Sequence, residues 1–87
     1  MNTFKLIIST PDGNKFEDEV VKFDVRGVLG ELAIMAGHIP FVTTVVSAPC
    51  KVELPDGTQK TATCDGGLLT VTSNTTTFFS GSFEFDQ

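Results

Sequence analysis

The sequence predicts a single all-β domain, an antiparallel β-sandwich or flattened barrel of eight to ten short strands. Its apolar residues are dominated by eight Phe and many Val, accompanied by many Thr, with neither Trp nor Tyr, and such side chains suit pleated sheets. Short apolar runs are separated by turn-forming Gly, Pro, Asn and Asp at the spacing typical of sandwiches. No uninterrupted helical period of ten or more residues appears. A chain of 87 residues supports one hydrophobic core, so residues 1–87 are expected to form one domain.

Strand and turn signals alternate through the first half of the chain. Apolar side chains alternate with polar ones in residues 4–10, as in a half-buried strand, and the Thr-Pro-Asp-Gly turn at 10–13 ends it. The same alternation predicts a strand over 21–26 that stops at Gly27. Residues 41–48 are apolar or Thr at nearly every position, so both faces of a strand formed there would be largely uncharged. This indicates a central strand that is either covered on both faces or has an outer face that meets a partner.

Asp56 and Gly57 are predicted to form the tip of a β-hairpin, because the apolar alternation of residues 50–54 precedes them and a second run follows. A two-residue turn there would place Cys50 opposite Thr63, with Cys64 one position away. The two thiols would then be close without being directly paired, and this register disfavours a disulfide. Two cysteines without the C-x-x-C spacing are expected to be reduced and to act as small apolar side chains.

The second half of the chain continues the same pattern to its end. A pair of glycines at 66–67 precedes an apolar strand over 68–71, and Ser-Asn at 73–74 supplies the next turn. Residues 75–79, Thr-Thr-Thr-Phe-Phe, are strong strand formers. The final alternation, over 82–87, predicts one more strand with a solvated acidic edge.

The formal net charge is −5, from eleven acidic and six basic residues, and the basic residues are scattered. Nucleic acid and anionic lipid both require a concentrated positive patch, so neither is expected as a partner, whereas a protein partner remains open. The sequence has neither an apolar segment long enough to span a bilayer nor a signal-peptide pattern at its N-terminus. A cytoplasmic, soluble chain is therefore expected.

Catalysis is not expected, because His38 is the only histidine and the chain lacks the nucleophile-elbow, phosphate-loop and two-histidine metal motifs. His38 is interpreted either as a loop residue whose ring hydrogen-bonds a nearby carbonyl and holds the bend from Gly37 to Pro40, or as an interface contact. Glu31 is interpreted either as a solvated turn carboxylate or as a charge offered to a basic partner. We therefore expect no catalytic residue, no metal site and no cofactor.

Three stretches follow one another along nearly all of the chain: F-K-L-I-I-S-T-P-D-G, V-R-G-V-L-G-E-L-A-I-M-A-G-H-I-P-F-V-T and D-G-G-L-L-T-V. In this order they resemble the N-terminal domain of the epsilon subunit of F-type ATP synthases. The corresponding family features are a strand ending in T-P-x-G, the motif G-x-x-G-E-x-G-I-x-P-G-H-x-P and a later x-G-G-F-L-x-V. Each piece alone is a weak signal, and the three together at matching spacing are a strong one.

The resemblance implies a ten-stranded β-sandwich that is not itself an enzyme. It implies a place in the rotor's central stalk, packed on the gamma subunit and resting on the polar loops of the membrane c-ring, so that ion flow is coupled to ATP synthesis. Carried over to this sequence, it implies that Gly30, Glu31 and Leu32 contact the c-ring and that Thr10 and His38 lie close to gamma. The expected location is peripheral, at the cytoplasmic face of a bacterial plasma membrane.

The sequence departs from the family pattern at three positions: Ala33 replaces the usual Gly, Ala36 the usual Pro and Leu68 the usual Phe. The Ala36 difference restores freedom to the unfolded loop that Pro would remove. Most members also continue into an inhibitory two-helix hairpin, and because this sequence stops at Gln87 neither hairpin-dependent inhibition nor a nucleotide site is expected. The alternative function is a free-standing sandwich that binds a small ligand such as a nucleotide, since sandwiches serve many functions.

Overall fold

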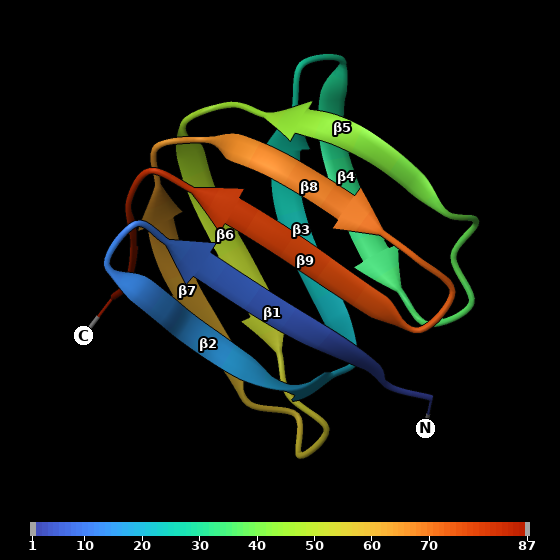
Figure 1. Ribbon diagram of the computed structural model, residues 1–87. Coiled ribbons are helices and arrows are strands. Elements are labelled where there is room, and N and C mark those ends of the chain that lie inside the picture. The colour runs from blue at the N-terminus through green and yellow to red at the C-terminus, as the bar shows by residue number, and fades with distance from the viewer. Residues whose placement is uncertain (1, 87) are drawn as a thin grey trace.

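The computed structural model describes residues 2–86, which form ten β-strands and, within that range, no helix (Figure 1). The strands are β1 (Phe4–Thr10), β2 (Gly13–Val20), β3 (Lys22–Gly27), β4 (Gly30–Met35), β5 (Phe41–Val45), β6 (Ala48–Glu53), β7 (Gln59–Cys64), β8 (Gly67–Val71), β9 (Thr75–Ser80) and β10 (Phe83–Phe85). The predicted last strand ran to Gln87, which lies outside the described residues.

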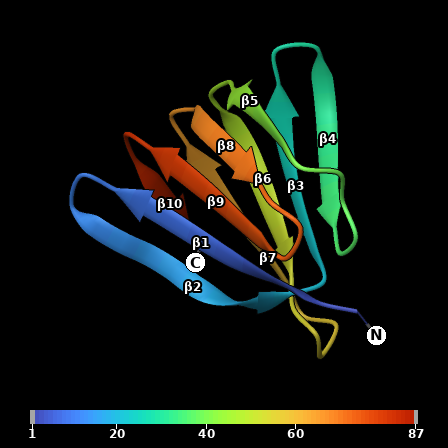
Figure 2. The same cartoon turned by 45° about the vertical axis from the view of Figure 1, so that its right-hand side comes forward.

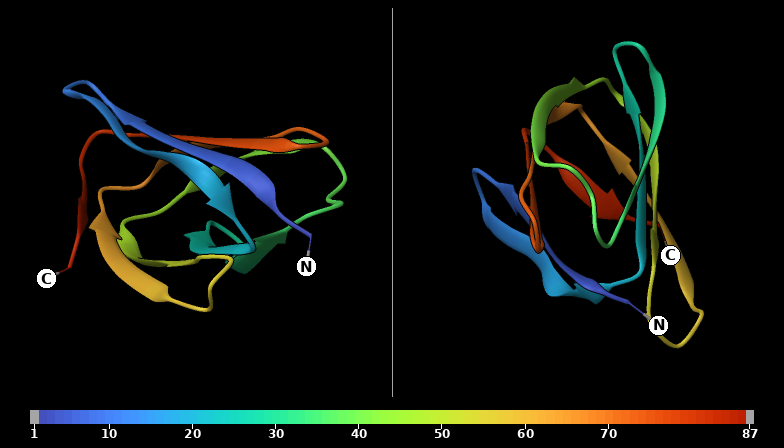
Figure 3. Two further views of the ribbon diagram at one scale, coloured as in Figure 1. Left: turned by 90° about the horizontal axis from the view of Figure 1, so that it is seen from below. Right: turned by 90° about the vertical axis from the view of Figure 1, so that its right-hand side faces the viewer.

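One continuous sheet curls back on itself into two facing layers (Figures 2 and 3). Its strand order is β10-β7-β6-β3-β5-β8-β9-β1-β2, and β4 pairs with β3 off this path. Strands β2, β1, β9, β8 and β5 form one layer, and β10, β7, β6, β3 and β4 form the other. The predicted fold class, a ten-stranded β-sandwich or flattened barrel, is confirmed. The sequence did not indicate that one pairing, between β1 and β9, is parallel.

The two layers are joined at β3 and β5 by a narrow backbone link. Only the pair Gly27 and Val45 connects these strands in register, and one hydrogen bond beside it runs from the amide of Val46 to the carbonyl of Arg26 at 2.9 Å. Beyond this point β3 pairs with β4 and β6, and β5 pairs with β8.

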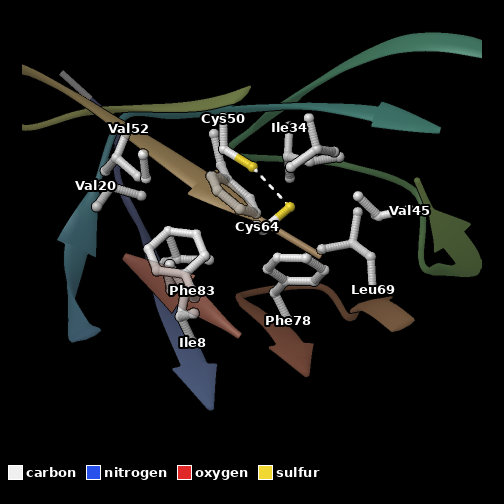
Figure 4. Packing of buried hydrophobic residues seen from close by; sticks show 14 of the residues in the cluster. Ile8, Val20, Ile34, Val45, Cys50, Val52, Cys64, Leu69, Phe78 and Phe83 are labelled. Atoms are coloured by element: carbon white, nitrogen blue, oxygen red, sulfur yellow. Dashed lines mark hydrogen bonds between the residues drawn. The ribbon is translucent and has the colours of Figure 1, made fainter. Parts of the chain in front are cut away.

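The core lies between the layers and is built from the inward positions of each strand (Figure 4). In β1 the alternation recognised in the sequence buries Phe4, Leu6 and Ile8. Three phenyl rings meet at the centre: Phe23 and Phe78 have centroids 5.8 Å apart, and Phe78 lies edge-on to Phe83 at 6.2 Å. These tilted contacts suit aromatic quadrupoles and join the two layers.

Two strands, β2 and β4, fall where no strand was expected. Of the eight residues of β2 only Val20 is buried, and of the six residues of β4 only Ile34 is buried. Both strands depend on backbone pairing with one neighbour each, β1 and β3 respectively. They therefore lack the apolar alternation by which the other strands were recognised.

The strand predicted over residues 41–48 is shorter than expected. Strand β5 ends at Val45, and the chain turns into β6 at Ala48. The side chain of Val42 is 61% exposed, so the interpretation of a strand covered on both faces is wrong for this chain. The other interpretation, an outer face available to a partner, remains.

The register predicted for the β6–β7 hairpin is wrong by one residue. Cys50 lies opposite Ala62, and Cys64 lies opposite Ala48. The turn has three residues instead of two, because the amide of Leu54 bonds the carbonyl of Thr58 at 2.8 Å and Gly57 has the positive φ of 91° that closes such a turn. The shift puts both cysteines on the buried face of the hairpin.

Candidate functional site

The β3–β4 hairpin presents an apolar tip. Gly27 and Gly30 form its closing pair, which leaves Val28 and Leu29 as a two-residue turn, and Gly30 has the positive φ of 133°. Leu29 is fully exposed and Val28 is 61% exposed. Exposed apolar side chains at the end of a hairpin are available for contact with another molecule.

The predicted c-ring contacts lie at this hairpin end. Glu31 is exposed and is the second residue of β4, opposite Arg26, so it belongs to a strand instead of the turn assumed from the sequence. Gly30 is exposed, whereas Leu32 is half-buried and packs against the core. A hollow of about 290 Å³ separates the hairpin tip from the start of β5 and is lined in part by Leu29, Glu31 and Leu32.

His38 lies in the loop between β4 and β5. Its Nε2 is 3.1 Å from the carbonyl oxygen of Ala33, so this nitrogen carries the hydrogen and donates. The ring also lies 6.1 Å from the ring of Phe41, centroid to centroid. The predicted carbonyl hydrogen bond of His38 is confirmed, and it ties the loop to β4. Next to it, Ile39 is 81% exposed.

Thr10 is buried at the turn between β1 and β2. Its hydroxyl donates to the carbonyl of Gly13 at 3.2 Å and accepts from the amide of Asp12 at 3.2 Å. The side chain therefore shapes the turn and offers little surface, with an exposed fraction of 5%. The β1–β2 turn and the β4–β5 loop lie at opposite ends of the molecule (Figure 1), so the structure does not bring Thr10 and His38 together.

Between these two ends lies the outer surface of β5, β8, β9 and β1, which we call the uncharged face. Three large apolar side chains are about half exposed or more on it: Val42 at 61%, Leu68 at 50% and Phe79 at 52%. Cross-strand pairing places Leu68 directly opposite Phe79. The outward positions in two neighbouring rows of paired residues are Thr44, Leu68, Phe79 and Ser9, and Val42, Thr70, Thr77 and Ile7.

None of the eight side chains in these two rows is charged. Charges begin at the margin on β1 and β2, where Lys5 and Glu17 form an ion pair at 3.2 Å with both side chains 46% exposed. An apolar and hydroxyl-bearing patch bordered by charges is the composition expected of a protein docking surface. The uncharged face is therefore a candidate interaction surface.

Leu68 and Phe79 were not among the residues selected from the sequence. The signal that could have found them is a pair of consecutive large apolar residues in one strand, as in Leu68-Leu69 and Phe78-Phe79, because consecutive residues point to opposite faces of the sheet. Leu69 and Phe78 are buried, so the neighbouring residue must face outward. The same signal was recognised for residues 41–48, and there it correctly marked Val42.

Within residues 2–86, no three His, Cys, Asp or Glu side chains are grouped so that they could hold a metal ion. Across the same residues, no helix has the length and hydropathy to cross a bilayer. The polar contact of His38 is with the backbone carbonyl of Ala33, and this contact fixes the conformation of the β4–β5 loop.

Comparison with known families finds one match over nearly the whole chain. Residues 3–86 match the model of the ATP synthase delta/epsilon chain β-sandwich domain. The chain is 33% identical over 85 residues to the sodium ion specific ATP synthase epsilon chain of Acetobacterium woodii, covering 98% of this chain and 64% of the relative. It is also 33% identical over 87 residues to an ATP synthase epsilon chain of Clostridium perfringens, covering all of this chain and 65% of the relative.

A similar fold occurs in a cryo-EM structure of the mitochondrial ATP synthase of Euglena gracilis, described as containing OSCP, F1 and the c-ring. The TM-score is 0.90 at 19% sequence identity, over 95% of this chain and 53% of the matched chain. At that identity the likeness concerns the fold. The chain spans just under two thirds of the length of the two bacterial relatives.

Proposed function

Because this chain belongs to the β-sandwich domain family of the ATP synthase delta and epsilon chains, we propose that it is a coupling element of the rotor. In this proposal the domain docks on the gamma subunit of the central stalk and rests on the polar loops of the c-ring. It passes rotation of the ring to gamma and performs no bond chemistry. The observation that carries the proposal is the uncharged face.

The uncharged face supports docking on gamma through its exposed apolar area. Leu68 and Phe79 are paired side by side and each is about half exposed, so a partner that covers them gains the transfer free energy of that area. Specific interfaces bury roughly 1,000 to 2,000 Å² in total. The face extends over four strands, and this extent suits a protein partner better than a small ligand.

The residues expected near gamma lie at the two ends of this face. His38 holds the β4–β5 loop at one end through its bond to Ala33, and Thr10 holds the β1–β2 turn at the other. We propose that both contribute mainly by fixing the shape of the surface that gamma meets. The ring of His38 is half-buried and can also contact gamma directly, whereas Thr10 acts through the backbone of its turn.

The hairpin tip supports the proposed contact with the c-ring. Glu31 supplies a carboxylate beside the exposed Val28 and Leu29, so the tip combines a charge for basic groups with apolar area. Gly30 keeps the turn tight, and Leu32 anchors the strand to the core. The hairpin lies at a separate corner from the β1–β2 turn and the β4–β5 loop (Figure 1), which allows the ring and gamma to be engaged together. The assembly would be peripheral to the cytoplasmic face of the membrane.

The test is binding of the purified chain to a folded gamma subunit from the same source. Comigration in size-exclusion chromatography and a saturable calorimetric titration are expected. A chain that fails to bind folded gamma in both assays would refute the proposal. A parallel titration with ATP addresses the alternative of a small-ligand module: saturable binding of ATP together with no binding of gamma would support that alternative instead.

A further inference from the structure

The two cysteines meet inside the sandwich although they are not directly paired. Cys50 on β6 and Cys64 on β7 occupy diagonal positions on the same buried face, and their Sγ atoms are 3.3 Å apart (Figure 4). The residue directly opposite each cysteine is an alanine, Ala62 or Ala48. Because alanine is small, each thiol can lean along the hairpin toward the other.

The distance between the sulfur atoms is short enough for a covalent bond to form after a small movement. A disulfide bond is about 2.05 Å long, so Cys50 and Cys64 must approach by a further ~1.2 Å. Both sulfurs also lie near one acceptor, the carbonyl of Ala48, at 3.7 and 3.5 Å. The two side chains are thus already directed to one place.

A surface hollow adjoins β6 next to one of the two cysteines. A hollow of about 480 Å³ opens where β6 parts from β3, and Cys50 lines it together with Pro49, Lys51 and Thr61. The pairing of β3 with β6 ends at Asp24 and Lys51, so β6 is no longer paired with β3 beside Cys50, and the hollow separates it there from the β3–β4 hairpin. Cys50 is nevertheless 3% exposed, so a local opening of the wall of this hollow is needed before a reagent reaches the sulfur.

We propose that Cys50 and Cys64 are a redox modification site that closes to an intramolecular disulfide when the protein meets an oxidising low-molecular-weight disulfide such as oxidised glutathione. The first thiolate attacks the small disulfide, forms a mixed disulfide and releases one small thiol. The second thiolate then attacks the protein sulfur of that mixed disulfide and releases the second small thiol. In total, two protein thiols lose two protons and two electrons, and one small disulfide is reduced to two thiols. The proposal does not depend on the function proposed above.

Two features make the closed form slow to appear and easy to reverse. Burial raises the pKa of the Cys50 thiol, and the hydrogen bond and charge of Cys64 act in the same direction, so oxidation should accelerate as the pH rises. The diagonal placement also requires the strands to shift as the bond forms, and strained disulfides are the readily reduced ones. Such a bond suits transient oxidation in a reducing compartment.

The test exposes the folded full chain to a series of oxidised to reduced glutathione ratios, followed by acid quenching, alkylation of remaining thiols and intact-mass measurement. The expected product is a monomer that has lost the mass of two hydrogen atoms, takes up no alkylating reagent and recovers both thiols with dithiothreitol. Cys50→Ala and Cys64→Ala provide matched controls, each of which should keep one thiol and form no intramolecular bond. Circular dichroism and urea unfolding establish that each variant is folded.

Three outcomes would overturn the proposal. The folded chain could keep both thiols at every ratio while the urea-unfolded chain oxidises, which would show that the fold forbids the bond. The product could be a disulfide-linked dimer. It could also stop at a lasting mixed disulfide with glutathione, which would show that the second sulfur cannot attack.

Discussion

Replacing Phe79 with threonine tests whether the uncharged face binds gamma. A phenylalanine side chain buries roughly 150 to 250 Å² when it is fully covered, and Phe79 is 52% exposed, so a partner can cover about 100 Å² more. At about 25 cal/mol per Å², that area contributes about 2.5 kcal/mol. Threonine keeps the strand preference and a methyl group, so we expect Phe79→Thr to cost about 2 kcal/mol of binding, or roughly a 30-fold weaker Kd.

The assay is calorimetric titration of the wild type and the variant with the gamma subunit, together with urea unfolding of the free chain. Because about half of Phe79 is already covered in the free chain, its replacement should also lower the free energy of unfolding, by up to about 2 kcal/mol, so urea unfolding must show that the variant is folded before its binding is compared. Leu29→Thr is the matched control: Leu29 is fully exposed but lies at the tip of the β3–β4 hairpin, away from the proposed gamma-binding face, and its replacement should leave Kd unchanged. Equal Kd values for Phe79→Thr and the wild type, or equal losses in both variants, would refute the placement of gamma on this face.

Three further predictions concern the fold, the hairpin and pH. In Gly67→Ala the new Cβ would overlap the carbonyl oxygen of Phe79 and lie 2.9 Å from its carbonyl carbon, at a φ of 154°, so we expect a loss of about 3 kcal/mol or more in the free energy of unfolding. Glu31→Lys should preserve that free energy and weaken coupling of reconstituted ATP synthase, measured as ATP-driven ion pumping. The backbone hydrogen bond from Thr58 holds the pKa of Asp56 below its usual value, so the stability that wild type has over Asp56→Ala should be present near pH 7 and lost as the pH falls through that lowered pKa.

Each of these predictions has its own control. Gly13→Ala is the comparison for Gly67, because its Cβ meets nothing within 4 Å and it should be destabilised only by its backbone conformation; equal losses for both variants would show that overlap is not the cause. An unfolded Glu31→Lys variant would show that Glu31 is structural, and a folded one with unchanged pumping would exclude it as a contact. For Asp56, a difference between wild type and Asp56→Ala that stays constant from pH 7 to pH 2 would contradict the expected dependence.

Strand positions were predictable wherever one face of the strand is buried. In β1 and β3 the buried and exposed residues alternate in the chain, and these strands fall almost where they were expected. Strands β2 and β4 bury one residue each, so their sequences carry no period that local reasoning could detect. Their positions follow from pairing with β1 and β3, which is a property of the assembled sheet.

The register of the β6–β7 hairpin depended on a single residue in the turn. Asp56-Gly57 correctly marked the tip, but such a pair fits turns of two or three residues. The three-residue form changes every pair along the hairpin and places Cys50 and Cys64 on the same face. The expected closeness of the thiols is confirmed, whereas the argument that disfavoured a disulfide rested on the wrong register.

The candidate site was predictable only in part. Glu31 and His38 were selected from the sequence itself, whereas their proposed contacts came from the family resemblance. The bond from His38 to a nearby carbonyl was one interpretation of its position between Gly37 and Pro40. Leu68 and Phe79 come from strands separated in sequence, and their contact arises from the pairing of β8 with β9. A patch of this kind could not be assembled before the strand order was known.

The narrow link between β3 and β5 has a mechanical consequence for a part that carries load. Among the contacts between paired strands, a force applied at the hairpin tip can reach the uncharged face only through the pair of Gly27 with Val45 and the adjacent hydrogen bond from Val46 to Arg26. The other routes are the connecting loops, such as the one from β4 to β5, and the packed rings of the core. The domain should therefore be stiff along each layer and compliant in shear between them. In a rotor, such a link between the layers would briefly store elastic energy during each step of the ring, so that the torque passed to gamma would vary more smoothly than the rotation of the ring.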